Sequence, residues 1–584
     1  MNQRIIFTRY IIIIFFVIFF FRLWQLQLFD GEKFKNLSEK NRLRIIKTPA
    51  PRGIIYDRNG IPLVKNIPFF SVMLNPDELD SIDTSKLADL IGIKEADLID
   101  KIDKQRSSPF VPIKLKIGLT FEEVARIEAR KSDFPGVFVD TEVGRNYLFG
   151  KTGAHVIGYL GKIRSYQATA IDLKELPQDA LIGQWGIEAV FDKELRGMPG
   201  ERIIEVDAIG RELRLIREVS PIKGKDIYLS IDIDIHKAIE ESFGTKAGAL
   251  VAIKVDTGEV LALESLPSFD PNVFAKGVSY SDWIMLINDP KKPMLNRALQ
   301  SQYPPGSTFK IIPAIAGLEE RVVNNDFSAN CSGNLSYGKW NFGCWRKGGH
   351  GLVNLHRAIV ESCDVYFYEL GKRLGIDKIH KYAYAFGLGQ KTGLELIPVK
   401  EKSGLIPNVS WKEKNKRLPW YLGDTFISSI GQGFVLATPI QMANVTASVV
   451  NGGFIYKPSL LFNVKQPSVK IDVAEESLNT IKKAMAGVVN EPGGTAKGAI
   501  SQTVSIGGKT GTSQVVGKKK GLVAEKYMDH AWFIAFAPVE KPEIALAVFV
   551  EHGGGGGAVA APIAKKAIEA YFKGKLENKN DKNR

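Results

Sequence analysis

Hydrophobic residues are most densely grouped at the N-terminus. An unbroken apolar run extends from Tyr10 to Phe21, and further apolar residues follow on both sides, beyond Arg9 and Arg22. A run of about 20 residues whose flanking arginines can snorkel is long enough to cross a bilayer. No small-residue cleavage site follows it, so the sequence predicts an uncleaved transmembrane signal anchor within residues 1–30.

Strand and helix patterns alternate over the next part of the chain. Residues 51–64 contain two apolar runs around Asn59-Gly60, a dipeptide that favours a tight hairpin. Residues 85–105 and 119–131 carry apolar side chains three and four positions apart, as amphipathic helices do. We therefore predict one domain of mixed strands and helices over residues 31–225.

The remainder of the chain has strand patterns at both of its ends. Residues 248–266 hold two long apolar runs around an Asp-Thr-Gly turn, which is typical of a hairpin, and residues 544–553 form another apolar run. Because helical segments lie between them, the pattern predicts an α+β domain over residues 226–572 whose sheet combines distant parts of the chain. The polar residues 573–584 are predicted to be a disordered tail.

Composition and charge exclude some functions. With 584 residues the chain is too long for a single core, and its 45% hydrophobic and 24% charged residues are ordinary for folded domains. The formal net charge of +14 would suit a polyanion. However, no basic stripe interleaved with aromatic residues and no nucleic-acid motif is found, so the excess of lysine indicates a solvated surface rather than a nucleic-acid partner.

Candidate chemistry begins at residues 301–310, SQYPPGSTFK. The two prolines and the glycine end any preceding structure, so Ser307 is expected in the first turn of a helix, with Lys310 one turn later on the same face. The N–H groups of a helix terminus favour a developing oxyanion. A neutral lysine in reach can take the proton of the serine hydroxyl, and no histidine is needed.

Two further motifs follow in order. Ser362-Cys363-Asp364 opens a predicted helix, where Ser362 or Asp364 taken alone could equally be a helix N-cap. Lys509-Thr510-Gly511 continues with hydroxyl residues in a glycine-rich strand pattern, which suits pairing with a peptide-like substrate and binding of its carboxylate. Each motif alone is unspecific, because S-x-x-K also occurs at Ser220 and Ser336 and K-T-G also occurs at Lys151 and Lys391.

The ordered set S-x-x-K, S-x-D and K-T-G resembles that of the penicillin-recognising serine enzymes. Over nearly its whole length the chain is similar to class B penicillin-binding proteins. Asp364, where many relatives have asparagine, and residues 529–538 resemble the elongation-specific branch, whereas His236 stands where glutamine is expected. The other motifs that carry the resemblance include Arg52-Gly53, residues 56–60, 145–147 and 186–188, Asn296-Arg297-Ala298 and Gly431-Gln432-Gly433.

The resemblance implies peptidoglycan D,D-transpeptidation. Ser307 would attack the carbonyl of a D-Ala-D-Ala stem with Lys310 as base, and the backbone N–H groups of Ser307 and Thr512 would hold the oxyanion. Residues 31–225 would form a non-catalytic pedestal. The other implied roles are proton relay by Ser362 and Lys509, positioning by Asp364, and substrate binding by Thr510, Gly511 and Thr512.

The resemblance also implies a setting and partners. The catalytic domain would lie outside the cytoplasm of a bacterium, on a single-pass anchor in the cytoplasmic membrane. It would work with a SEDS-family glycan polymerase and other elongation proteins, and β-lactams would acylate it. Two alternatives stay open at this point, a membrane-anchored β-lactam sensor and a catalytically silent scaffold, as does the balance between transpeptidation and hydrolysis.

All three cysteines fall between residues 331 and 363. Cys331, Cys344, His350 and Cys363 are four ligands of the types that bind tetrahedral zinc, in a glycine-rich segment without apolar periodicity. The alternative is a disulfide between Cys331 and Cys344 with Cys363 buried. Resemblance to the elongation-specific branch favours a structural zinc, and no cofactor is expected for catalysis.

Overall fold

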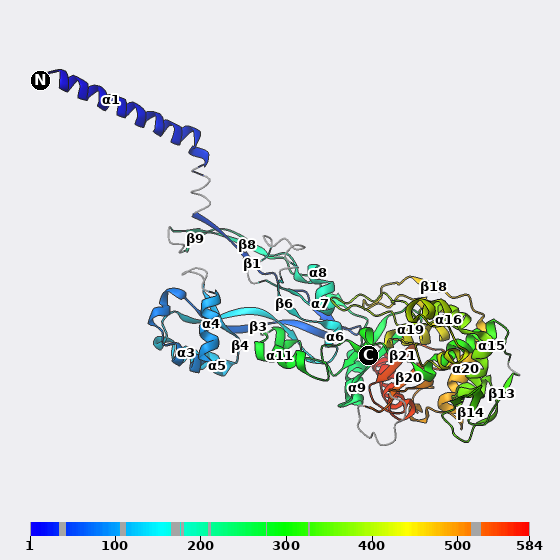
Figure 1. The fold of residues 1–584 in the computed structure, drawn as a ribbon. Coiled ribbons are helices and arrows are strands. Elements are labelled where there is room, and N and C mark those ends of the chain that lie inside the picture. The colour runs from blue at the N-terminus through cyan, green and yellow to red at the C-terminus, as the bar shows by residue number, and fades with distance from the viewer. Residues whose placement is uncertain are drawn as a thin grey trace.

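The N-terminal helix stands apart from the rest of the chain (Figure 1). Helix α1 (Asn2–Trp24) continues into a π-helical turn, and the segment Ile5–Phe29 has a mean hydropathy of 2.3 with none of it buried. Among the described residues, one helix is therefore long and apolar enough to cross a membrane. This computed structural model describes residues 2–33, 35, 42–105, 112–164, 167, 176, 180–207, 212–275, 277–324, 327–515 and 527–582.

The pedestal domain, predicted over residues 31–225, has strands between residues 43 and 228, and they form two main sheets. The strand order is β1-β8-β9 in the first and β10-β2-β3-β4 in the second, where β5 also pairs with β3. Helices α3, α4 and α5 close a separate apolar core at the far end of the second sheet (Figure 1). The strands are β1 (Leu43–Thr48), β2 (Ile55–Tyr56), β3 (Pro62–Leu74), β4 (Ile113–Leu119), β5 (Val137–Tyr147), β6 (Leu160–Lys162), β7 (Leu181–Gly183), β8 (Gly200–Val206), β9 (Glu212–Val219) and β10 (Ile227–Tyr228), and the helices are α3 (Thr84–Ile91), α4 (Glu95–Gln105), α5 (Phe121–Ala129), α6 (Ala154–Ile157), α7 (Gly186–Val190) and α8 (Asp192–Arg196).

The turn between β2 and β3 differs from the expected two-residue hairpin. Gly60 has a φ of +80°, but Asn59 is not in the left-handed region. The Asp57 carboxylate instead accepts the N–H groups of Asn59 and Ile61, both at 2.8 Å. An Asx-type turn therefore replaces the type I′ turn that the dipeptide favours.

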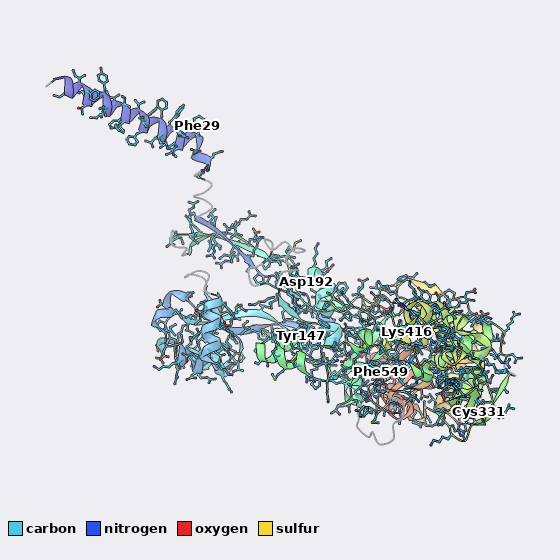
Figure 2. All side chains as sticks on the ribbon, in the orientation of Figure 1. Phe29, Tyr147, Asp192, Cys331, Lys416 and Phe549 are labelled. Atoms are coloured by element: carbon cyan, nitrogen blue, oxygen red, sulfur yellow. The ribbon has the colours of Figure 1, made fainter. Side chains whose placement is uncertain are left out.

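A buried ion network joins the segments of the pedestal. The Glu188 carboxylate accepts from Arg52 Nε at 2.8 Å and from Arg145 Nε at 2.6 Å, and Arg52 also bonds Asp192 at 2.9 Å. Tyr147 and Asp192 lie where the pedestal meets the C-terminal domain (Figure 2). Three of the motifs that resemble the family therefore serve to hold segments of the pedestal together.

The C-terminal domain is built on one five-stranded antiparallel sheet of order β12-β11-β21-β20-β19. Every residue of β20 and β21 is buried, so helices cover both faces of the sheet. This confirms the predicted α+β domain with a sheet from distant segments. The strands are β11 (Gly248–Lys254), β12 (Val260–Leu266), β19 (Gly507–Ser513), β20 (His530–Ala537) and β21 (Ile544–Val550).

Helices from all parts of the domain pack on this sheet. Helices α9 and α21 contact each other and the sheet, whereas α19 contacts β11, β20 and β21. The helices are α9 (Ile233–Phe243), α10 (Asn272–Ala275), α11 (Tyr280–Asn288), α12 (Arg297–Gln300), α13 (Ile311–Glu319), α14 (Leu355–Val360), α15 (Asp364–Leu374), α16 (Ile376–Ala385), α17 (Val409–Lys416), α18 (Leu422–Ser429), α19 (Pro439–Val450), α20 (Glu475–Asn490) and α21 (Ala561–Lys582). The short outer strands are β13 (Ser328–Cys331), β14 (Asn334–Tyr337), β15 (Trp340–Gly343), β16 (Gly351–Asn354), β17 (Phe454–Tyr456) and β18 (Ser468–Lys470).

The end of the chain differs from the expected disordered tail. Helix α21 continues to Lys582, through most of the segment 573–584 that the polar composition assigns to a tail. Lysine and glutamate are good helix formers, and extending an existing helix needs no new nucleus. The backbone therefore stays helical although no apolar periodicity continues.

Candidate active site

Ser307 lies in a tight turn that precedes a buried helix. Residues Gly306–Lys310 form a 3₁₀-helix and α13 follows directly, which corrects the expected α-helical first turn. In a 3₁₀-helix residues three apart are eclipsed, so Lys310 still shares a face with Ser307. Among the residues that the structure describes, the Ser307 hydroxyl has no hydrogen-bond partner.

Lys310 connects this turn to the second motif. Its side chain is fully buried, and Nζ lies 2.7 Å from Asp364 Oδ1, 2.9 Å from Ser362 O and 3.4 Å from Ser362 Oγ. Lys509 Nζ donates to the same Ser362 Oγ at 2.8 Å. Two lysines and one hydroxyl therefore form a continuous buried chain, with Asp364 as the counter-charge.

Ser362 adopts a backbone conformation that is uncommon outside glycine. Its φ is +56°, in the left-handed region, and such strain is typical of functional positions. The N-cap of α15 is Cys363, and no side chain caps this helix. Ser362 therefore does not cap this helix, which was one of the roles that the sequence allowed. Its hydroxyl contacts Lys310 and Lys509 instead.

Burial dominates the electrostatics of Lys509. The side chain is fully buried, which lowers the pKa of Lys509 well below its usual range. The nearby charge of Lys310 lowers this pKa further, and Asp364 acts in the opposite direction. The site therefore favours an uncharged amine at Lys509.

The third motif lies on β19, the edge strand of the sheet. Thr510 Oγ1 is hydrogen-bonded to Thr495 Oγ1 at 2.8 Å, and Thr512 O accepts from Gln432 Nε2 at 2.8 Å. Gly511 packs so closely that a Cβ there would lie 2.6 Å from Pro305 O. The strand that carries Lys509 is thus pressed directly against the turn that carries Ser307.

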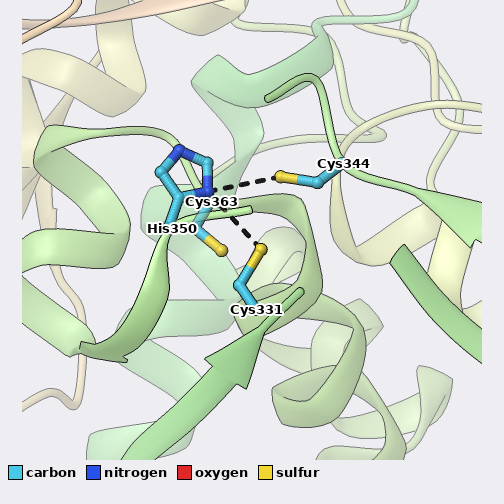
Figure 3. Close-up of side chains that lie close together, drawn as sticks. All are labelled: Cys331, Cys344, His350 and Cys363. Carbon is cyan, nitrogen blue, oxygen red and sulfur yellow. Dashed lines mark hydrogen bonds between the residues drawn. The ribbon is translucent and has the colours of Figure 1, made fainter. Parts of the chain in front are cut away.

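The three cysteines and His350 form one buried cluster (Figure 3). Their candidate ligand atoms all lie within 4.8 Å of one another, and His350 Nδ1 lies 3.5 Å from the sulfurs of both Cys331 and Cys344. All three cysteines are unpaired, unlike in the disulfide alternative. The donor set of one imidazole and three sulfurs could hold a metal ion.

The cluster is coupled to the catalytic candidates through Asp364. A hydrogen bond from the Cys363 thiol lowers the pKa of the Cys344 thiol. A lowered pKa favours the thiolate form, which is the form of cysteine that binds a metal ion. The backbone N–H of Asp364 also donates to Cys344 Sγ at 3.4 Å. The carboxylate that contacts Lys310 thus belongs to a residue held by the cluster.

Comparison with known proteins decides the family. The family model of the penicillin-binding protein transpeptidase domain matches residues 248–569, and that of the penicillin-binding protein dimerisation domain matches residues 47–229. The peptidoglycan D,D-transpeptidase MrdA of Acinetobacter baumannii is 37% identical over 98% of this chain and 88% of its own length. The chain belongs to the class B penicillin-binding proteins.

Solved structures support the same assignment. A complex of penicillin-binding protein PBP2 with MreC from Helicobacter pylori has a TM-score of 0.80 at 30% identity, over 91% of this chain and 99% of that one. A chain of a peptidoglycan synthase complex that coordinates polymerization and crosslinking has a TM-score of 0.73 at 30% identity, over 98% of both chains. This class B penicillin-binding protein is a peptidoglycan D,D-transpeptidase.

Sequence reasoning on this penicillin-binding protein did not identify several residues of the site. Trp345 donates its backbone N–H to Asp364 Oδ2 at 2.9 Å and its indole N–H to Ser362 O at 3.1 Å. Thr495 and Gln432 contact the K-T-G strand at Thr510 and Thr512. Of these three residues, only Gln432 could have been found from the sequence, because it lies within the Gly431-Gln432-Gly433 motif of the class.

Proposed function

We propose that Ser307 is the nucleophile of a transpeptidase that cross-links stem peptides during cell elongation. The observation that carries this proposal is the buried chain from Asp364 through Lys310 and Ser362 to Lys509. It supplies a base one turn from the serine and a path for a proton away from it.

The first half-reaction forms an acyl-enzyme. Ser307 Oγ attacks the carbonyl carbon of the scissile D-Ala-D-Ala bond while Lys310 takes the hydroxyl proton. The C–N bond then breaks, and the proton reaches the departing D-alanine amine through Ser362 and Lys509. Since Ser362 Oγ contacts both lysines, one hydroxyl can accept a proton from one side and donate on the other.

Backbone and hydroxyl groups of β19 complete the binding site. The N–H groups of Ser307 and Thr512 hold the oxyanion, while Thr510, Gly511 and Thr512 bind the terminal carboxylate of the stem. The amine of a second stem then attacks the acyl carbon and releases Ser307. β-Lactams acylate the same hydroxyl, and the family name of the transpeptidase domain supports this part of the proposal.

The buried cluster holds a structural zinc ion. Zinc takes sulfur and imidazole ligands in four-coordinate sites, and Cys331, Cys344, His350 and Cys363 supply that number and type of donor. When bound, the ion pins a segment that has little apolar core of its own. Because Cys344 contacts the backbone of Asp364, this stabilisation extends to the catalytic wall.

The setting is the outer face of a bacterial cytoplasmic membrane. A single apolar helix anchors the chain, and the domains that follow lie in the periplasm. A SEDS-family glycan polymerase and other elongation proteins are the proposed partners. The solved relatives in complex with MreC and within a peptidoglycan synthase complex support this assignment.

Intact mass spectrometry of the full chain in detergent tests the nucleophile. After incubation with benzylpenicillin, the wild type should gain one stable adduct and Ser307→Ala should gain none. An adduct of the same yield on Ser307→Ala would overturn the assignment. A Ser336→Ala variant, which alters an exposed S-x-x-K serine, serves as the matched control and should acylate normally.

A further inference from the structure

Three segments that are far apart in the sequence meet beside Ser307. They are residues 304–306, residues 431–432 and residues 511–513, which we call the three-segment junction. Gly306 N donates to Gly431 O at 2.9 Å, which joins the first two segments. The third segment is the end of β19.

Gln432 fixes the outward edge of β19. Its side-chain amide donates to Thr512 O at 2.8 Å. In a strand the N–H and C=O of one residue point to the same side, so this bond shows that both groups of Thr512 point away from β20. The Thr512 N–H thus faces the same edge as Gln432, beside the turn that carries Ser307.

Ser513 fixes the strand at the next residue. Its side chain is fully buried, and its hydroxyl donates to Pro304 O, three residues before the nucleophile. Gly306 lies so close to Thr512 that a Cβ on Gly306 would be 2.6 Å from Thr512 O. The distance between the backbone of Thr512 and that of residues 304–306 is therefore set by direct contact and by one hydroxyl bond.

We infer that Gln432 and Ser513 are positioning residues that hold the Thr512 N–H at a fixed distance and angle from the Ser307 N–H. This inference rests on the proposed function, in which these two N–H groups stabilise the oxyanion. Neither side chain needs to touch the substrate, because each acts through the backbone of another residue. They hold the N–H groups of Ser307 and Thr512, which are about 200 residues apart in the sequence, in one preorganised arrangement.

Misplaced N–H groups should affect the acylation step and leave non-covalent binding unchanged. An oxyanion exists only as the serine attacks, so misaligned N–H groups slow acylation without weakening the initial complex. A misplacement of about 1 Å is enough to cost on the order of 100-fold in rate. We therefore expect the acylation rate constant for benzylpenicillin to fall about 10- to 100-fold, with the dissociation constant of the non-covalent complex unchanged.

The test uses stopped-flow acylation of the full chain in detergent by benzylpenicillin. The variants are Gln432→Glu, which keeps the shape but loses the donor, Ser513→Ala, and Ser513→Thr, which keeps a hydroxyl. Gln466→Ala and Ser505→Ala, two half-buried residues away from the junction whose side-chain hydrogen bonds are exposed, are the matched controls. Thermal unfolding of each variant is measured alongside.

The expected result is a slower acylation step for Gln432→Glu and Ser513→Ala, recovery in Ser513→Thr, and no change in the controls. A second probe, a peptide boronic acid, should lose affinity in the same variants, because its tetrahedral adduct places an oxygen where the oxyanion forms.

Equal acylation constants in folded Gln432→Glu and Ser513→Ala would overturn the inference. So would a loss confined to the non-covalent dissociation constant. Either result would leave the proposed function intact provided that Ser307→Ala still forms no adduct. An adduct on Ser307→Ala would instead reject the proposed function itself.

Discussion

Lys310 Nζ lies 2.7 Å from Asp364 Oδ1, with Lys310 fully buried and Asp364 nearly so. This ion pair is the one counter-charge that the described hydrogen bonds and ion pairs provide for the two catalytic lysines. Removing one partner of a buried pair is costly because the other charge is left unpaired. The pair thus links the stability of the site to its reactivity.

Asp364→Ala should lower both properties. We expect a loss of about 3–5 kcal/mol in the free energy of unfolding, and acylation by benzylpenicillin about 100-fold slower. Asp364→Asn should recover part of the rate, since an amide oxygen can still accept from Lys310. Denaturant unfolding and stopped-flow acylation measure the two effects, and equal rates for wild type and Asp364→Ala would contradict this role.

Lys509→Met should separate stability from activity. A fully buried lysine amine costs desolvation energy, and a methionine of similar length removes that cost. The unfolding temperature is expected to stay the same or rise, while acylation slows by about 100-fold or more. A large drop in unfolding temperature would show that Lys509 is primarily structural.

His530 should make the protein sensitive to mild acid. The ring is buried and its Nδ1 accepts the backbone N–H of His552 at 2.9 Å. Burial, followed by the neighbouring His552, lowers the pKa of His530 to about 4, from a usual value of about 6.5. The unfolded chain therefore binds more protons in that range, so stability is complete above pH 6.5 and is lost as the pH falls towards 4.

The comparison with His530→Gln isolates this effect. On going from pH 7.5 to pH 4.5, wild type should lose about 2 to 3 kcal/mol of unfolding free energy more than the variant. Urea unfolding at the two pH values gives the difference, since all other groups titrate in both proteins. The same pH dependence in both would show that another group is responsible.

Metal content tests the Cys331, Cys344, His350 and Cys363 cluster. We expect about one zinc ion per chain by elemental analysis, and a lower unfolding temperature after treatment with a strong chelator. Cys331→Ser should reproduce the chelator effect, because it removes one sulfur donor. A fully folded, metal-free protein whose unfolding temperature does not respond to zinc would contradict the proposal.

The residue types and spacing allowed much of the site to be predicted. S-x-x-K, S-x-D, K-T-G and the cysteine cluster are local patterns, and the structure brings Lys310, Ser362, Asp364 and Lys509 together. The sheet was predictable for the same reason, because four of its five strands, β11, β12, β20 and β21, each carry an apolar run. The pattern of apolar and polar residues indicates which faces of the strands and helices are buried, and this is enough to predict the fold class.

The remaining features depend on contacts that no local pattern records. The left-handed Ser362 and the bond from Ser513 to Pro304 O depend on how distant loops are packed. Gln432 bonds a backbone carbonyl, a group that every residue has, so nothing at Thr512 indicates its partner. The tight turn at Ser307 likewise follows from contact with β19 and not from helix propensity.

The order of strands in the catalytic sheet also determines when this domain can fold during synthesis. Strands β11 and β12 emerge early, yet β11 must pair with β21, which lies near the end of the chain. A sheet dominated by such long-range pairing closes late, because the entropy of a long loop is lost before the contacts form. The nascent catalytic segment therefore exposes the unpaired edge of β11 until β21 arrives. During that interval, aggregation or chaperone capture competes with folding.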